Sequence, residues 1–102
     1  MDKIATFISM TVGLGGNNYI FKSGDDEYMA CVGLWRKSGF ETVIFKNYKD
    51  DKRMASIETY TDPRVVMPEE ALKRIGIEAI GRPIEKWEVF GSPLMSDKWD
   101  VQ

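Results

Sequence analysis

Residues 19–30 are YIFKSGDDEYMA, and residues 43–55 are VIFKNYKDDKRMA. With one gap, the two stretches share Ile-Phe-Lys, Asp-Asp and Met-Ala at matching places. Each stretch is an apolar run, a charged turn and a second mixed run, which is the pattern of a β-hairpin. The repeat therefore predicts two similar hairpins, and it indicates an architecture without indicating a chemistry.

The segments around the repeat extend it to an antiparallel meander. Alternating and β-branched residues predict five strands, at 3–12, 18–22, 27–35, 40–48 and 54–60. Glycine, asparagine and charged residues between these runs are typical of turns. The meander should end at Asp62-Pro63, because proline has no N–H to donate to a strand ladder.

Residues 27–35 are the stretch for which the local pattern is ambiguous. Tyr28, Val32 and Trp35 have helical spacing, and several neighbours are good helix formers. The repeat instead aligns Met29-Ala30 with Met54-Ala55, which open the convincing strand MASIETY. We expect a strand here. The alternative makes residues 26–37 helical and gives two helices on a four- to five-strand sheet.

The second half of the chain predicts one helix and a further strand. Pro68 suits the first helical position, and the two glutamates after it complement the helix dipole. An apolar stripe continues to Ile80, with Gly81 as the stop; alternatively the helix ends at Gly76 and residues 77–80 form a short strand. Residues 84–90 alternate and predict a sixth strand.

The expected fold is therefore α+β. It is an antiparallel meander of five to six strands with one α-helix packed on one face. We expect residues 1–91 to form a single domain and residues 92–102 to form a C-terminal tail. The length of 102 residues suffices for a core without disulfides.

Composition narrows the possible partners and the location. Fourteen basic and 16 acidic residues give a net charge of −2, which makes nucleic acid or anionic lipid an unlikely partner. Cys31 is the single cysteine, so no internal disulfide can form, which fits a reducing compartment. The chain has neither a signal-peptide pattern nor an apolar stretch of about 20 residues. We expect a cytoplasmic protein with no membrane contact.

No catalytic, cofactor-binding or metal-ligating residues are expected. The chain has no histidine, which excludes Ser-His and Cys-His catalytic pairs, and one thiol cannot build a zinc site. The acidic runs at 25–27 and 50–51 are typical of hairpin tips, where aspartate caps turn amides. The glycine-rich stretch 13–18 leads into a strand and not a helix, so it predicts a turn and not a phosphate loop. Cys31 is expected in the core.

The strand at 27–35 motivates the main functional hypothesis. Strict alternation places Tyr28, Ala30, Val32 and Leu34 on one side and Met29, Cys31, Gly33 and Trp35 on the other. A strand that is apolar on both faces must be covered on both faces, and one helix covers one. The second face needs the C-terminal tail, a second copy of the chain in a homodimer, or another protein.

We therefore expect a non-catalytic protein-binding module. The residues expected to bind the partner are Met29, Trp35, Tyr48 and Trp99, since large apolar and aromatic side chains form most interface hot spots. A compact module of this kind would suit a small inhibitor, encoded by a phage or mobile element, that acts on a larger host complex.

Two other functions are considered beside it. A nucleic-acid-contacting accessory protein could use the basic hairpin tip at 46–53, through Lys46, Lys49, Lys52 and Arg53, although Asp50 and Asp51 dilute its charge. A small histidine-free enzyme would need a pocket that holds a carboxylate with a raised pKa.

Overall fold

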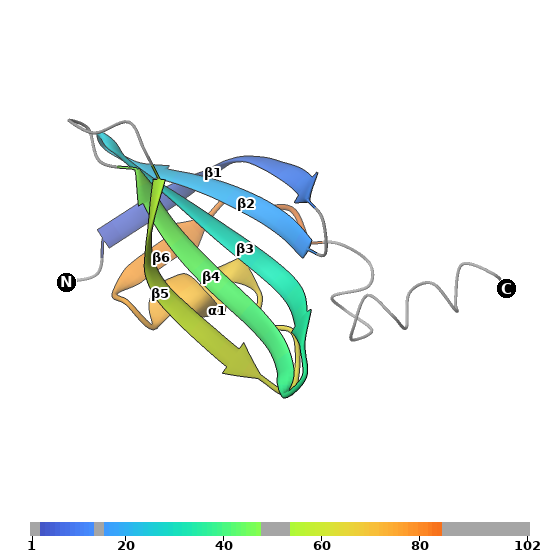
Figure 1. Ribbon diagram of the computed structural model, residues 1–102. Coiled ribbons are helices and arrows are strands. Elements are labelled where there is room, and N and C mark those ends of the chain that lie inside the picture. Colours follow the sequence, from blue (N-terminus) through green and yellow to red (C-terminus); the bar gives the residue numbers. More distant parts are fainter. Residues whose placement is uncertain (1–2, 14–15, 48–53, 85–102) are drawn as a thin grey trace, which may run out of the picture.

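The computed structural model describes residues 3–13, 16–47 and 54–84, which fold around one curled sheet (Figure 1). Six strands of the described residues lie in the order β5-β4-β3-β2-β1-β6. The elements, in chain order, are β1 (Lys3–Gly13), β2 (Gly16–Ser23), β3 (Asp26–Arg36), β4 (Gly39–Asn47), β5 (Met54–Asp62), α1 (Pro68–Lys73) and β6 (Ile77–Ile80).

The first five strands form the antiparallel meander that the sequence predicts. Each pairs with the next, so both copies of the repeat lie on hairpins: β2 with β3 and β4 with β5. Residues 26–36 form a strand that pairs along both sides, and the helical alternative for 26–37 is wrong. The ladders on both sides of β3 outweigh its helix-forming residues, as tertiary context commonly does.

The segment after β5 departs from the prediction of a helix that continues to Ile80. α1 ends at Lys73, because the chain tightens into a turn in which the Gly76 N–H donates to the Lys73 carbonyl (3.1 Å). Gly76 then takes a φ of +80°, which ends the helix and which glycine adopts without strain. Residues 77–80 form β6, which pairs with β1 in parallel. The sixth strand expected at 84–90 lies almost wholly outside the described residues.

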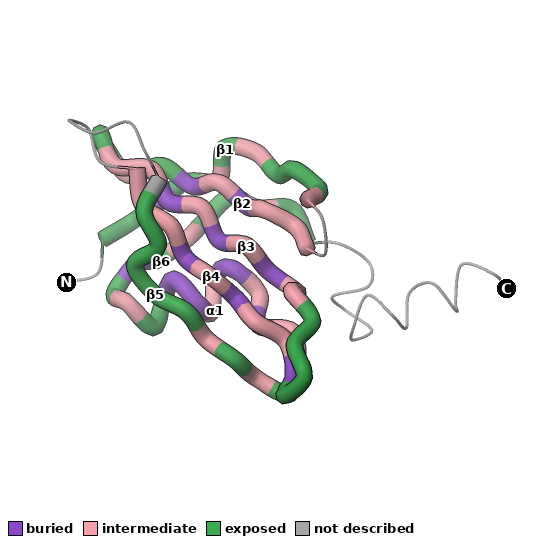
Figure 2. The backbone as a smooth tube through the Cα atoms, viewed as in Figure 1, coloured by how far each residue is buried: buried purple, intermediate pink, exposed green. Residues whose placement is uncertain are grey.

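One face of the sheet, which we call the inner face, is covered by α1 and by the segment 63–67 that leads to it. Buried positions alternate along β2, β3 and β4 (Figure 2). The core consists of Ala5, Tyr19, Phe21, Tyr28, Ala30, Val32, Ile44, Val66, Ala71, Leu72 and Ile77. The buried Thr42 hydroxyl donates to the Val66 carbonyl (3.1 Å). This hydrogen bond links the segment 63–67, which we call the crossing segment, to β4.

Cations cover the tyrosines where α1 does not reach. The Arg82 guanidinium lies 5.1 Å from the Tyr19 ring and binds both Glu69 oxygens, at 2.6 and 2.8 Å. Lys3 and Lys46 each lie 5.7 Å from the ring of Tyr28. These cation–π contacts cover the two tyrosine rings, so the short helix α1 needs to cover only the rest of the inner face.

Candidate functional site

The opposite face of the sheet, the outer face, carries apolar side chains at its centre. Ladder partners share a face, so β2, β3 and β4 bring together five residues that we call the outer patch: Ile20, Met29, Cys31, Val43 and Phe45. All five are half-buried. The helix and the crossing segment lie on the inner face, so none of the described elements outside the sheet covers the outer patch (Figure 1).

Polar residues frame the outer patch on the same face. The row Ile20-Met29-Phe45 ends in Ser9 on β1 and Ser56 on β5. Toward one end of the strands, Lys22 lies opposite Glu27, and toward the other the Arg36 guanidinium binds Glu41 (3.1 Å). Serine, lysine and glutamate around an apolar centre give the outer face the composition of a binding surface with a polar rim.

A β-bulge at the end of β3 decides which side chains enter the outer patch. The register between β3 and β4 shifts by one residue between Cys31 and Leu34, and Gly33 within it has a φ of +88°. Without the shift, Phe45 would pair with Ala30 and would share the face of that core residue. Because a one-residue slip reverses the facing of a strand, the bulge is what puts Phe45 beside Met29.

The structure separates the residues that the sequence predicts for partner binding. Met29 lies at the centre of the outer patch. The prediction that Trp35 shares its face is wrong, because the bulge intervenes: Trp35 pairs with Phe40, stacks on it edge-to-face (centroids 5.0 Å apart) and is 66% exposed. The prediction that Leu34 shares the face of Tyr28 is wrong for the same reason, because Leu34 pairs with Glu41 on the outer face. Tyr48 and Trp99 lie outside the described residues. The sequence analysis missed Ile20, Val43 and Phe45, although a glycine inside a strand pattern is a signal for a bulge.

Cys31 belongs to the outer patch and not to the core, where it was expected. It is half-buried, and this burial raises the pKa of its thiol, with a smaller effect from the nearby Glu41. A raised pKa keeps the thiol protonated at neutral pH, and the protonated form is a poor nucleophile. Cys31 therefore contributes a small apolar surface here.

The acidic hairpin tip of the first repeat copy is occupied by ion pairs. The Asp26 carboxylate accepts from Lys3 (2.6 Å) and lies 3.8 Å from the Lys46 ammonium. The hydrogen bond from Lys3 holds the pKa of Asp26 below its usual value. Within residues 3–13, 16–47 and 54–84, no group of three acidic or cysteine side chains is placed to hold a metal ion. Asp50, Asp51, Lys49, Lys52 and Arg53 lie outside these ranges.

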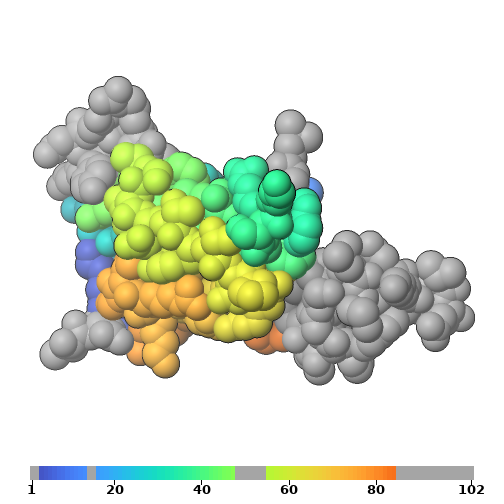
Figure 3. Space-filling view, turned by 60° about the horizontal axis from the view of Figure 1, so that its bottom comes forward, coloured from blue at the N-terminus to red at the C-terminus, as the bar shows by residue number. Residues whose placement is uncertain are grey.

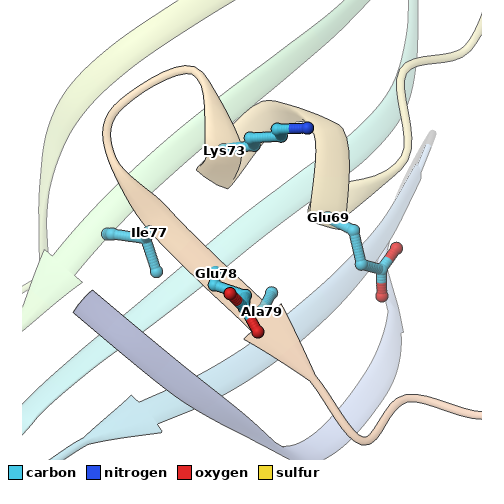
Figure 4. Close-up of a pocket in the computed structure, with 5 residues that line it drawn as sticks. All are labelled: Glu69, Lys73, Ile77, Glu78 and Ala79. Atoms are coloured by element: carbon cyan, nitrogen blue, oxygen red, sulfur yellow. The ribbon is translucent and has the colours of Figure 1, made fainter. Parts of the chain in front are cut away.

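A shallow hollow lies between α1 and β6 (Figure 4). Glu69 and Lys73 project from the helix above Ile77, Glu78 and Ala79, and the space holds about 270 Å³. Ligand pockets usually exceed roughly 300 Å³ and are more enclosed. Glu69 is already bound to Arg82, and the described carboxyl groups whose pKa is shifted, Asp26 and Glu70, are both shifted down. Neither Asp26 nor Glu70 lines the hollow.

The comparisons with known proteins found no match to this chain. No family model matches the chain, and no similar protein was found among curated proteins or solved structures. Among the described residues, no helix has the length and apolar character needed to cross a bilayer.

Proposed function

We propose that this protein is a non-catalytic protein-binding module that engages its partner through the outer patch. The observation that carries the proposal is an apolar centre on three adjacent strands, with none of the described elements over it. An apolar sheet face left in water is unfavourable, and its burial against another protein is the usual remedy. An apolar centre within a polar rim is also how binding hot spots are arranged.

The chemistry of the outer face indicates the kind of partner. The outer patch is uncharged, and its rim carries both signs, as Lys22 opposite Glu27 and Arg36 bound to Glu41. A complementary surface would therefore be apolar at its centre and close to neutral around it. These properties favour a folded protein over nucleic acid or an anionic membrane, both of which require excess positive charge.

Such a module acts by occupying a surface of its partner. This mode of action would serve a small inhibitor encoded by a phage or mobile element and directed at a larger host complex. The proposal of an inhibitor rests on the outer patch and on the lack of catalytic motifs in this sequence.

Capture from the native host tests the binding proposal when it is paired with matched variants. Met29→Glu places a charge at the centre of the outer patch, whereas Thr6→Glu places the same charge on the outer face outside it. We expect the partner, identified by mass spectrometry and rebuilt into a complex from purified components, to bind the wild type and Thr6→Glu but not Met29→Glu. Equal binding by both variants would show that the outer patch is not the binding surface.

The nucleic-acid alternative receives less support from the described residues. Lys46 alone of its four basic residues is described, and it lies near Asp26 and over the Tyr28 ring. The alternative predicts binding that weakens steeply with salt and with Lys49→Ala or Lys52→Ala.

A further inference from the structure

A large aromatic side chain lies exposed beside the turn between β3 and β4. Trp35 is 66% exposed, and its ring packs edge-to-face on the half-buried Phe40 of the facing strand. Phe40 in turn lies opposite Asp62 of β5, so the three residues form one row across this end of the sheet. In the space-filling view the end of β3, in blue-green, lies at the surface beside β5, in yellow-green (Figure 3). Tryptophan is enriched at binding hot spots, which makes this ring a contact point for a ligand.

The backbone of the turn holds the ring on a fixed support. Gly39 is buried against the end of β5, where an added Cβ would collide with the Asp62 carbonyl oxygen. The turn therefore packs directly on the backbone of β5. Beside it, the Arg36 guanidinium donates two hydrogen bonds to one Glu41 carboxylate oxygen (3.1 and 3.3 Å). A ring held in this way loses little freedom when a ligand covers it, which favours binding.

The charged groups around the ring present their cations to solvent. In the Arg36–Glu41 pair the arginine side chain is 55% exposed and the glutamate 21%. In the Arg64–Asp62 pair the arginine is again the more exposed partner. Lys37, at the turn itself, is exposed and has no ion pair with any residue in the described part of the chain. This end of the sheet therefore presents a positive surface, although the whole chain carries a net charge of −2.

We propose that Trp35, Phe40 and Lys37, which we call the turn surface, bind an acidic peptide segment of another protein. In this complex a large apolar side chain of the peptide packs on the exposed Trp35 ring, and a carboxylate beside it pairs with the Lys37 ammonium. The inference goes beyond the proposed function and does not depend on it, because the bulge at Gly33 separates Trp35 from the outer patch.

The small excess of positive charge favours an acidic peptide over nucleic acid. The arginines of this region are matched by as many carboxylates: Arg36, Arg64 and Arg74 with Glu41, Asp62 and Glu70. Lys37 then supplies the charge in excess, which suits one carboxylate. A strand of nucleic acid instead needs a groove of cations that follows its phosphates.

Random peptides displayed on phage serve as the probe, selected on the full chain and counter-selected on Trp35→Ala. We expect the enriched peptides to combine a large apolar residue with aspartate or glutamate beside it. A synthetic, fluorescently labelled copy of such a peptide should bind the full chain in anisotropy measurements, and added salt should weaken the binding. A selection that enriches no acidic peptide, or enriches it equally on Trp35→Ala, would overturn the inference.

Charge reversal supplies a test that does not depend on how well Trp35→Ala folds. Trp35→Ala should weaken the peptide about 30-fold, as the loss of a hot spot does. Lys37→Glu changes an exposed side chain at the turn and should weaken it about fivefold. Lys22→Glu, the matched control, makes the same reversal toward the other end of the strands and should leave the affinity unchanged. Equal affinities for the two lysine variants would contradict the pairing of the peptide with Lys37.

Two further measurements separate this inference from its neighbours. Met29→Glu alters the outer patch and should keep the peptide, whatever it does to the binding of the partner. A peptide that Met29→Glu releases and Trp35→Ala retains would support the proposed function and overturn this inference. Single-stranded oligothymidylate should not compete with the peptide; competition that Trp35→Ala abolishes would assign the turn surface to nucleic acid instead.

Discussion

The two copies of the repeat form the same kind of hairpin but turn their matching side chains to opposite faces. Phe21 of the first copy is fully buried on the inner face, whereas the matching Phe45 is half-buried in the outer patch. The preceding isoleucines are reversed: Ile20 lies in the outer patch and Ile44 in the core. A repeated sequence thus specifies two adjacent strands, while the register in the sheet specifies which face each side chain takes.

This difference divides the sheet into a packed inner face and an outer face that we propose for binding. The inner face has a helix, a crossing segment and cation-capped tyrosines. The outer face has the same apolar residue types with none of the described elements over them. Variants at matched positions of the two copies can break or sharpen this division.

Truncating the matching phenylalanines should give the largest difference. Phe21→Ala removes a fully buried ring and leaves a cavity, so it should lower the free energy of unfolding by about 3–5 kcal/mol. Phe45→Ala removes a ring that is partly in water already, so we expect a loss of about 1 kcal/mol. Urea denaturation monitored by circular dichroism measures both. Equal losses of unfolding free energy would mean that the two phenylalanines are equally buried.

Altering the bulge should have the next largest effect. Gly33→Ala forces a side chain onto a backbone with φ +88°, which should cost about 1–2 kcal/mol. The added Cβ meets no atom within 4 Å, so the cost comes from the backbone alone. Gly33→Asn is the control, because asparagine tolerates this conformation better and should recover part of the loss. Identical losses of stability for the two variants would show that backbone strain at the bulge is not the cause.

Exchanging threonine and valine on adjacent positions of β4 should have a smaller effect. Thr42→Val removes the hydroxyl that donates to the buried Val66 carbonyl, and we expect a loss of about 1 kcal/mol. Val43→Thr adds a hydroxyl on the outer face, where water can reach it, so we expect a change within about 0.5 kcal/mol. Thermal unfolding of the two variants gives the comparison. A larger loss from Val43→Thr would contradict the assignment of the faces.

Acid should weaken the inner face through Glu70, with the smallest effect of the four. Arg64 (2.9 Å) and Arg74 (2.8 Å) hydrogen-bond to its carboxylate and hold the pKa of Glu70 below its usual 4.5. A lowered pKa in the folded state gives stability that is complete above 4.5 and is lost as the pH falls through the folded value. Because the side chain is about 40% exposed, the contribution should stay below about 1 kcal/mol.

The pH prediction is measured with Glu70→Gln. The variant should be slightly less stable than the wild type at neutral pH, and the difference should shrink well below pH 4.5. A difference that does not change with pH would show that the carboxylate charge makes no contribution.

Much of the fold follows from local sequence, and the outer patch follows from it only in part. Alternation and turn residues predicted the five-strand meander, and the repeat correctly favoured a strand at 27–35 over a helix. The sequence indicated the strand β6 only as an alternative to a longer helix. Its pairing with β1 could not be predicted locally, because β1 is distant in sequence. Met29 was recognised, but Phe45 depends on a bulge at Gly33, and a register shift is a property of two strands together.

Solvent paramagnetic relaxation of isoleucine methyl groups in the free chain tests the division of faces most directly. Ile20 and Ile44 occupy the same place in the two repeat copies, so each serves as the control for the other. The account predicts strong broadening of the Ile20 methyl signal by a soluble paramagnetic agent and none for Ile44. Equal protection of the two methyl groups, at a concentration where the chain is monomeric, would show that the outer patch is already covered and would contradict its proposed role as a binding surface.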